Sequence, residues 1–316
     1  MDVKMETKSN KAWLKKEFFS PSILEEWLRL RAFQVRESPV NLGYSLAENW
    51  PNWPRGWEIG SVGGVSSTHD RYYVAHRGKN APSILCFDRE GKLIDSWGEG
   101  VFTNPHMIKC DKNDNIWVID SGDNVLYLFS PDGDIIKILG TKGVPGEDDC
   151  HFNKPTDIAF SLDDGVYVSD GYGNNRIVRF DNDLQFLSQW GSKGTGEGQF
   201  NLPHAITTDG DGIVYVADRA NWRVELFTPT GDYIRQWTHI GYPDGIVYSE
   251  DGFIYVCDGN NYRITKLDLH GNIIGFLGEA ELGFWQLNIA HDITVTEEGE
   301  ILVALLEGGV KLFVIN

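Results

Sequence analysis

The stretch LPHAITTDGDGIVYVAD, residues 202–218, decides the fold of this chain. It holds two apolar runs separated by the turn-forming sequence Asp-Gly-Asp-Gly, and its second run ends at Asp218. β-Branched and aromatic residues favour strands, whereas Asp and Gly favour tight turns. The stretch therefore predicts an antiparallel hairpin.

The same pattern recurs along the chain. Three segments align with it directly: NPHMIKCDKNDNIWVID from Asn104, KPTDIAFSLDDGVYVSD from Lys154 and YPDGIVYSEDGFIYVCD from Tyr242. A fifth copy, IAHDITVTEEGEILVAL, starts at Ile289, and a degenerate first copy, VGGVSSTHDRYYVAHR, starts at Val62. A repeat of about 40–50 residues is the sequence mark of a modular fold.

Each copy continues into a third strand, such as NRIVRF or YRITKL, and most add a fourth that ends in Trp-Gly or a similar pair, as in SWG (96–98) and QWG (189–191). Four short strands per repeat are typical of a propeller blade, so six copies predict an all-β, six-bladed β-propeller over residues 43–316. The last copy ends after its third strand. We therefore expect GYSLAENW, residues 43–50, to supply its outer strand and close the ring.

Residues 1–42 form a predicted N-terminal extension. Ser20-Pro21 is a typical helix start, and an apolar stripe after it predicts a helix over 21–36. The chain opens with charged residues and has no apolar segment typical of a secretory signal, so we expect a cytoplasmic protein. No apolar run approaches the ~18 residues of a transmembrane helix.

The composition narrows the range of partners. The chain of 316 residues has 28 Lys+Arg against 46 Asp+Glu, a formal net charge of −18. So acidic a surface argues against nucleic-acid binding and against docking on anionic membranes. The 35 glycines also disfavour a helical protein, because glycine penalises helix interiors.

Function in a repeat protein is best sought where equivalent positions diverge. One position at the start of the first strands holds His in the second, fourth and sixth copies, at His106, His204 and His291. The other three copies hold no His there. Alternate blades of six lie about 120° apart around the central channel, so these side chains should converge on its axis. Three imidazoles in that arrangement predict a zinc-like divalent metal with an open fourth position.

The loops after the second strands should surround the same mouth. Three of them carry unusual side chains, Arg77, Tyr172 and Arg219. Two arginines at this mouth predict a small carboxylate-bearing ligand. A tyrosine near a metal and two cations is expected to have a lowered pKa and to act as a base. The simpler alternatives are a shielding aromatic for Tyr172 and an ion pair between blades for Arg219.

Asp292 follows the last of the three histidines. It is expected either to orient a neighbouring group by accepting a hydrogen bond or to bind a structural calcium ion. The backbone carbonyls of Val65 and Ile108, at equivalent first-strand positions, are the expected further calcium ligands.

Two resemblances support these expectations. The recurring arginines 176, 223 and 263 stand in an element that resembles the NHL repeat, and we expect them to pair with the aspartates that end the second strands. An ordered set of motifs spans the predicted propeller: AHRG (75–78), NPHMI (104–108), FNKPTDIA (152–159), VSDGYGNNRIVRF (168–180), GQFNLPHAI (198–206), VADRANWRVELF (216–227) and AHDI (290–293). This set resembles peptidyl-α-hydroxyglycine α-amidating lyase.

That resemblance implies roles for single residues. It implies zinc on His106, His204 and His291, catalytic roles for Tyr172 and Arg77, and substrate-carboxylate binding by Arg77 and Arg219. It also implies calcium on Asp292 with the carbonyls of Val65 and Ile108. The implied reaction cleaves an N-acyl-α-hydroxyglycine to a primary amide and glyoxylate. Gly173 stands where the family has a cysteine, which leaves Cys150 without that partner.

We therefore expect a zinc-dependent carbon–nitrogen lyase acting on an α-hydroxyglycine or a related small carbinolamide. A metal-dependent hydrolase or lactonase on the same propeller is one alternative. A non-catalytic NHL scaffold for protein partners is the other.

Overall fold

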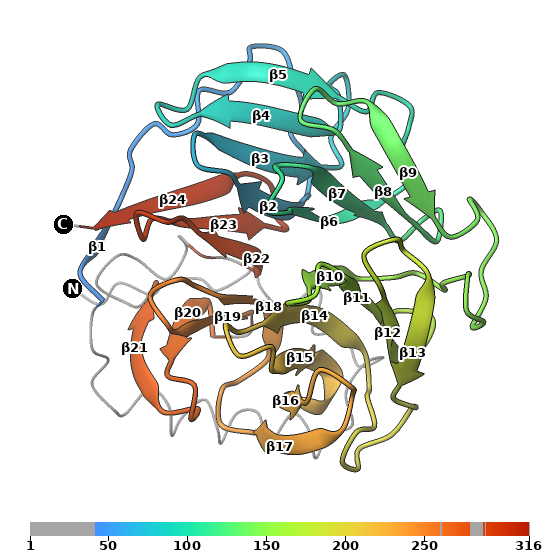
Figure 1. Cartoon of the computed structure of the whole chain (residues 1–316). Coiled ribbons are helices and arrows are strands. Elements are labelled where there is room, and N and C mark those ends of the chain that lie inside the picture. Colours follow the sequence, from blue (N-terminus) through green and yellow to red (C-terminus); the bar gives the residue numbers. More distant parts are fainter. Residues whose placement is uncertain (1–41, 260, 279–286, 288, 316) are drawn as a thin grey trace, which may run out of the picture. The chain divides into compact units, whose positions relative to one another are not determined.

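The computed structural model describes residues 42–259, 261–278, 287 and 289–315. These residues form six four-stranded antiparallel sheets arranged as the blades of a propeller (Figure 1). The predicted helix over 21–36 lies outside the described residues and stays a prediction. In the described part of the chain, no helix has the length and apolar composition needed to span a bilayer.

The blades follow one another in chain order. Blade 1 contains β2 (Val62–Ser67), β3 (Arg71–His76), β4 (Ile84–Asp88) and β5 (Leu93–Trp97). Blade 2 contains β6 (Pro105–Cys110), β7 (Ile116–Asp120), β8 (Val125–Phe129) and β9 (Ile135–Leu139). Blade 3 contains β10 (Asp157–Phe160), β11 (Val166–Asp170), β12 (Arg176–Phe180) and β13 (Phe186–Trp190).

The second half repeats this plan. Blade 4 contains β14 (Pro203–Thr208), β15 (Val214–Asp218), β16 (Arg223–Phe227) and β17 (Tyr233–Trp237), with the short 3-10 helix η1 (Arg219–Asn221) after β15. Blade 5 contains β18 (Pro243–Tyr248), β19 (Ile254–Asp258), β20 (Arg263–Leu267) and β21 (Ile273–Leu277). Blade 6 contains β22 (Ala290–Val295), β23 (Ile301–Leu305), β24 (Val310–Ile315) and β1 (Tyr44–Leu46).

The first strand of each blade lies at the centre of the propeller. Each of these six strands packs against the first strands of both neighbouring blades, which closes a ring around a channel (Figure 1). The second strands are buried except for Arg71 at the start of β3, whereas outer strands such as β9 expose most of their residues. The six-bladed, all-β expectation is thereby confirmed.

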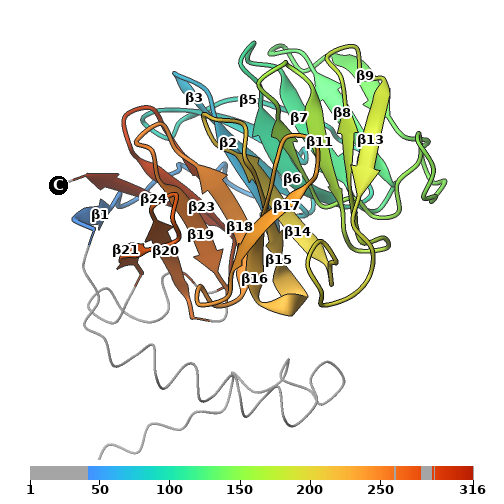
Figure 2. The same ribbon diagram turned by 60° about the horizontal axis from the view of Figure 1, so that its bottom comes forward.

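The chain closes the propeller with strands from its two ends. β1 pairs antiparallel with β24, with Ser45 opposite Val314, so the outer strand of blade 6 comes from the early part of the chain (Figure 2). Tyr44 is buried in this blade, and its hydroxyl donates to the carbonyl of Gly299 at 3.0 Å. The expected closure by a strand within 43–50 is confirmed.

The recurring arginines pair with the aspartates that end the second strands of their own blades. Arg223 donates from Nε to Asp218 at 2.8 Å, and both side chains are almost fully buried. The pairs Arg176–Asp170 and Arg263–Asp258 repeat this contact at 3.0 and 3.3 Å. Each buried carboxylate is thus neutralised where a second strand ends, as the sequence indicates.

Candidate active site

Three β-bulges direct the ring of histidines into the channel. In blade 2 the pairing of β6 with β7 passes from Pro105 to Met107, so His106 is an extra residue without a partner in the ladder. The same shift occurs at His204 in β14 and at His291 in β22. A bulge bends the strand and re-aims one side chain, and bulges are frequent next to active sites.

Each histidine of the ring is oriented by the backbone of the next blade. In every case Nδ1 lies within hydrogen-bond distance of a carbonyl oxygen at the equivalent position of that blade. The separations are 2.6 Å each, from His106 to Thr156, from His204 to Asp244 and from His291 to Gly63. A carbonyl can only accept, so Nδ1 carries the proton and Nε2 keeps its lone pair.

The three Nε2 lone pairs meet inside the channel. All three side chains are buried, and each offers one ligand atom within 4.8 Å of the other two. Burial lowers the pKa of all three imidazoles, that of His291 to about 3, and the positive charge of Arg219 contributes to each shift. They are therefore neutral near pH 7, which is the form that binds a metal ion.

Tyr172 covers the three histidines from the loop after β11. Its hydroxyl oxygen lies 3.0 Å from Nε2 of His106 and 3.0 Å from Nε2 of His204. One hydroxyl proton can serve only one of these two acceptors at a time. A cation at the point of convergence would satisfy the lone pairs that the phenol leaves unpaired, so the donor set fits zinc or a similar metal.

The pKa of Tyr172 differs from the sequence expectation. Burial of its hydroxyl raises the pKa above the usual range, and the charges of Arg219 and Arg77 oppose that rise. The groups of the chain alone therefore do not produce the lowered value that we expected. Tyr172 as a whole remains partly accessible, since 37% of its surface is exposed.

Arg77 reaches the mouth from the loop after β3. Its Nε donates to the carbonyl of Pro105 at 2.9 Å, whereas its buried Nη2 has no hydrogen-bond partner among the described residues. Gly63 makes room for it, because a Cβ on Gly63 would lie 2.8 Å from Nη2 and 2.3 Å from the carbonyl oxygen of His106. His76 fixes the Arg77 loop, since its Nδ1 accepts from Gly78 and its Nε2 bonds to Pro82.

Arg219 lies beside Tyr172, in the short 3-10 helix η1 after β15. Its Nη1 lies 2.9 Å from Oδ1 of Asp244, which confirms the ion pair between blades that was its simpler alternative. Its guanidinium also lies 5.5 Å from the ring centre of Tyr172 and 5.6 Å from that of Tyr242. Its Nε is buried with no partner in the described part of the chain, so the ion pair uses only part of its donor capacity.

Asp244 was not identified from the sequence. Its carbonyl orients His204 and its carboxylate holds Arg219, so one residue links the histidine ring to the cationic side of the mouth. Burial raises the pKa of its carboxyl to about 6, and Arg219 opposes that rise. Its position in the repeat could have revealed it. Asp244 stands in blade 5 at the position that holds histidine in blades 2, 4 and 6, and it is the only acidic residue at that position among the six copies.

Asp292 follows His291 on β22, and its carboxylate contacts a lysine at the place where calcium was expected. Its Oδ1 is 2.8 Å from Nζ of Lys109, and its Oδ2 accepts from the backbone N–H of Val65 at 3.0 Å. Asp292 thus orients its neighbours by hydrogen bonds, as one sequence reading proposed. Calcium needs six to eight oxygen ligands, and the Lys109 ammonium would repel it. The calcium site at Asp292, Val65 and Ile108 stays a prediction, and the contact that the structure shows for Asp292 is the ion pair with Lys109.

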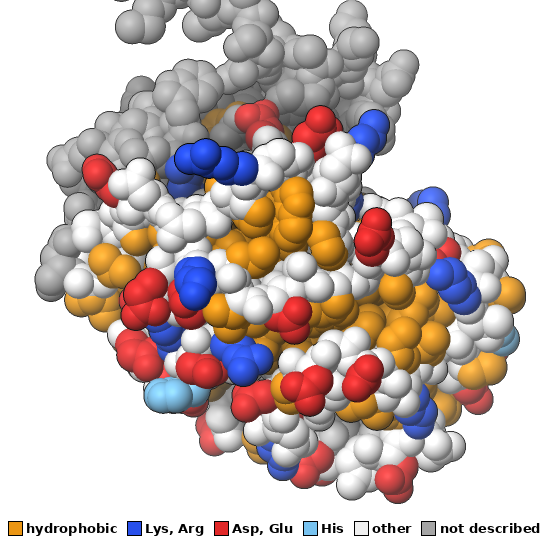
Figure 3. Space-filling model, turned by 90° about the horizontal axis from the view of Figure 1, so that it is seen from above, with side chains coloured by type: hydrophobic (Ala, Val, Ile, Leu, Met, Phe, Trp, Pro, Cys, Tyr) orange, Lys and Arg blue, Asp and Glu red, His pale blue; other side chains and the backbone are white. Residues whose placement is uncertain are grey.

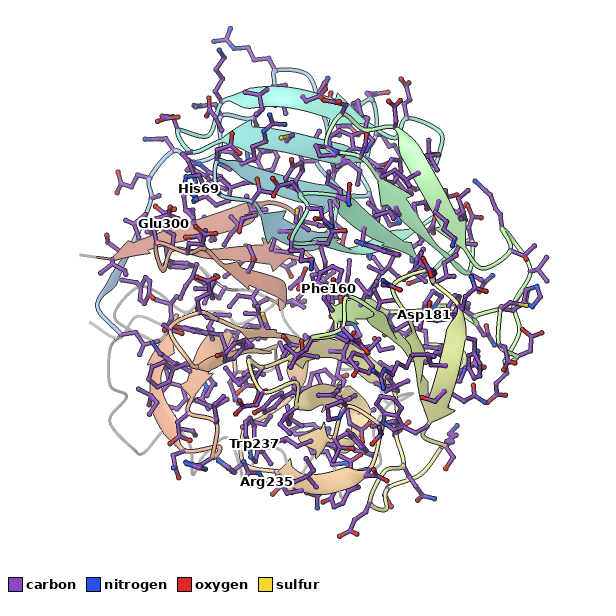
Figure 4. The ribbon with its side chains drawn as sticks, in the orientation of Figure 1. His69, Phe160, Asp181, Arg235, Trp237 and Glu300 are labelled. Atoms are coloured by element: carbon purple, nitrogen blue, oxygen red, sulfur yellow. The ribbon has the colours of Figure 1, made fainter. Side chains whose placement is uncertain are left out.

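The histidines outside the ring have peripheral positions. His69 is exposed near Glu300 at the contact of blades 1 and 6, with Nδ1 3.3 Å from Glu297 (Figure 4). His239 and His270 are also exposed, and His151 lies on an outer loop.

Two segments of the chain match the family model described as NHL repeat, residues 152–180 and 241–267. They lie in blades 3 and 5. The human protein named NHL repeat-containing protein 3 is 31% identical over 69% of this chain and 66% of its own length.

A Caenorhabditis elegans protein named "Probable peptidyl-alpha-hydroxyglycine alpha-amidating lyase pgal-1" is 38% identical over 51% of this chain and 50% of its own. The chain thus spans between half and 66% of the length of these two relatives. Among solved structures, a streptogramin B lyase has a TM-score of 0.62 at 16% identity, covering 86% of this chain and 98% of that one. At that identity the likeness concerns the fold alone.

Proposed function

We propose, from the premise that this chain is an NHL-repeat β-propeller whose homologues include peptidyl-α-hydroxyglycine α-amidating lyases, that it is a metal-dependent carbon–nitrogen lyase. Its proposed substrate is an N-acyl-α-hydroxyglycine or a related small carbinolamide with a carboxylate. The products are a primary amide and glyoxylate.

One observation carries the proposal. Three neutral imidazoles, a phenol and two partly unpaired guanidinium groups converge on one mouth of the channel. A non-catalytic scaffold has no need of three buried, neutral imidazoles whose unpaired nitrogens face one another, because such an arrangement costs free energy. These groups are explained together by a metal ion and an anionic substrate.

His106, His204 and His291 would hold the metal through Nε2. When bound there, zinc would act as a Lewis acid toward the hydroxyl of the substrate and favour its ionised form. The carbonyls that accept from the Nδ1 atoms fix the tautomer of each ring before any ligand enters.

Arg77 and Arg219 would bind the substrate carboxylate. Each has a buried N–H without a partner among the described residues, Nη2 in Arg77 and Nε in Arg219. Charge-assisted hydrogen bonds from two guanidinium groups orient a carboxylate and compensate for its desolvation. Because Asp244 already neutralises part of the charge of Arg219, Arg77 supplies most of the unpaired positive charge.

Tyr172 would transfer the proton. Burial raises the pKa of its hydroxyl, and a cation held by the three histidines would oppose that rise and favour the ionised form. In that form Tyr172 accepts the proton of the substrate hydroxyl while the carbon–nitrogen bond breaks and the hydroxyl carbon becomes the aldehyde carbon of glyoxylate. The same proton then passes from Tyr172 to the departing amide nitrogen. The step is balanced, because atoms and charge are conserved and no water is consumed.

The test is product identification with α-hydroxyhippurate as the probe. Metal-loaded protein should release benzamide and glyoxylate in equal amounts, and the His204→Ala variant should release neither above the uncatalysed rate. Absence of both products from the metal-loaded protein would refute the proposal. Hydrolysis of a sugar lactone without glyoxylate formation would instead favour the lactonase alternative.

A further inference from the structure

Two outer loops of the propeller have the same hydrogen-bonded frame. In blade 3 the N–H of Gly146 donates to the carbonyl of Phe152 at 3.0 Å, and in blade 4 that of Gly194 donates to Phe200 at 3.0 Å. A buried arginine organises each loop by donating to three carbonyls. These are Glu147, Asp148 and His151 for Arg176, and Thr195, Gly196 and Gln199 for Arg223.

The side chains of these loops diverge at three matching positions. Blade 4 holds two glycines and a glutamine there, at 196, 198 and 199. Blade 3 holds Asp148, Cys150 and His151, whose side chains all carry metal-binding atoms. The three histidines of the channel were found by the same kind of difference. In both places, residues that can bind a metal ion stand at positions where a neighbouring copy of the repeat holds a residue without such a side chain.

The three side chains of the blade 3 loop already face one another. Cys150 Sγ lies 3.3 Å from Asp148 Oδ1 and 3.4 Å from His151 Nδ1, and the last two atoms are 2.9 Å apart. Tetrahedral zinc, with bonds of ~2.3 Å to sulfur and ~2.0–2.1 Å to nitrogen or oxygen, places its ligand atoms roughly 3.3–3.6 Å from one another. The observed distances therefore need to change by only a few tenths of an ångström.

We propose that Asp148, Cys150 and His151 form a second metal site, for zinc or a chemically similar transition-metal ion. Sulfur, imidazole nitrogen and carboxylate oxygen form a ligand set that suits such ions and not calcium or magnesium. Binding replaces the proton of the Cys150 thiol, which passes to solvent, and a water molecule takes the fourth position. Cys150 and Asp148 are exposed, so the ion enters from solvent without any opening of the fold.

The proposal is tested with cobalt(II) added to the full chain under a thiol-free reductant. The histidine ring contains no sulfur ligand, so a thiolate-to-cobalt charge-transfer band in the near ultraviolet reports on Cys150. We expect two bound equivalents per chain, one of which brings the band. Cys150→Ser and His151→Gln should each lose that equivalent and the band and keep the other.

Thiol labelling gives an independent readout. Cys150 is the exposed cysteine of the four, while Cys86 and Cys257 are buried and Cys110 is partly buried. Zinc should slow the labelling of Cys150 at least tenfold in the wild-type chain and should not slow it in His151→Gln. A single cobalt equivalent without the band, or labelling that zinc leaves unchanged, would overturn the proposal without affecting the lyase assignment.

Discussion

At the scale of single residues, the phenol of Tyr172 connects the three histidines to the arginines at the mouth of the channel. Its hydroxyl contacts Nε2 of His106 and of His204, and its ring lies beside the guanidinium of Arg219. Tyr242 has the same relation to Arg219, with its ring centre 5.6 Å from the guanidinium. Substituting each tyrosine in turn therefore separates the effect of proton transfer from the effect of packing against Arg219.

Tyr172→Phe should lower turnover of α-hydroxyhippurate by about 10²–10⁴-fold, which is the usual contribution of a general acid–base group. The number of metal ions bound at the ring should not change, because the ring of histidines remains. Tyr242→Phe is the matched control and should stay within a few-fold of the wild type. Steady-state kinetics and elemental analysis check both, and equal turnover in Tyr172→Phe and wild type would eliminate the proposed base.

Lys109 provides a second test at this scale. Its side chain is 14% exposed and pairs with the fully buried Asp292, and the carboxylates of Asp157 and Asp292 raise its pKa against the opposing effect of burial. Removing one partner of a buried pair costs about 3–5 kcal/mol, so Lys109→Met should be destabilised by that amount. Lys112→Met removes an exposed pair with Asp164 and should cost less than about 1 kcal/mol.

The contact between Lys109 and Asp292 also predicts that calcium does not affect the thermal stability of the chain. Because an ammonium already neutralises Asp292, a calcium chelator should leave the thermal midpoint of the wild-type chain unchanged. A drop of several degrees in the thermal midpoint on chelation, reversed by added calcium, would show that calcium and not the Lys109 ammonium neutralises Asp292. Differential scanning calorimetry measures both effects.

At the scale of elements, the arginine of the Arg–Asp contact in blades 3 and 4 also joins the blade to the loop that precedes it. Arg223 contacts Asp218, three carbonyls of the 195–199 loop and Gln236. Its loss leaves the buried carboxylate of Asp218 without its counter-charge. The loop that leads into β14 and His204 loses its anchor at the same time.

Arg223→Gln should therefore lower the free energy of unfolding by about 3–5 kcal/mol, measured by urea titration. Arg235 lies on the outer strand β17, where it is exposed and donates to the carbonyl of Leu269 (Figure 4). Arg235→Gln should change stability by less than about 1 kcal/mol. Equal losses in the two variants would mean that the buried contact has no special structural role.

Periodicity predicted the elements well, because each blade repeats the same hairpins and turns. It located the six blades, the closing strand and the arginines that pair with Asp170, Asp218 and Asp258. It could not predict the bulges at the three histidines, because a bulge depends on strand pairing and not on residue type. Lys109 was missed for a related reason, since its partner Asp292 is far away in the sequence.

At the scale of the whole molecule, acidic side chains are dispersed over the described part of the face that Figure 3 draws. The face in Figure 3 shows acidic and basic side chains interspersed with hydrophobic ones, without a broad basic patch on its described part. The formal net charge of the chain is −18. Against this background, Arg77 and Arg219 form a local cationic site inside the mouth, which suits a small anion and not a polyanion.

The closing strand determines whether the propeller acts as one unit. Tyr44 is buried in blade 6, and a chain that starts at Asn49 lacks β1 altogether. Loss of a buried aromatic costs about 3–5 kcal/mol, and each kcal/mol shifts the thermal midpoint by about 2–4 °C at this size. We expect a midpoint at least about 6 °C below that of a chain starting at Leu42; identical midpoints would contradict closure by β1.

The central claim is that a metal ion on the histidine ring is required for cleavage of the carbon–nitrogen bond. The most direct measurement is the rate of glyoxylate release from α-hydroxyhippurate as zinc is added to metal-depleted protein, using the Cys150→Ser variant so that only the ring binds. The rate should rise linearly from near zero and level off at one zinc per chain. A rate that is already maximal without metal, or that stays near zero at full occupancy, would contradict the account.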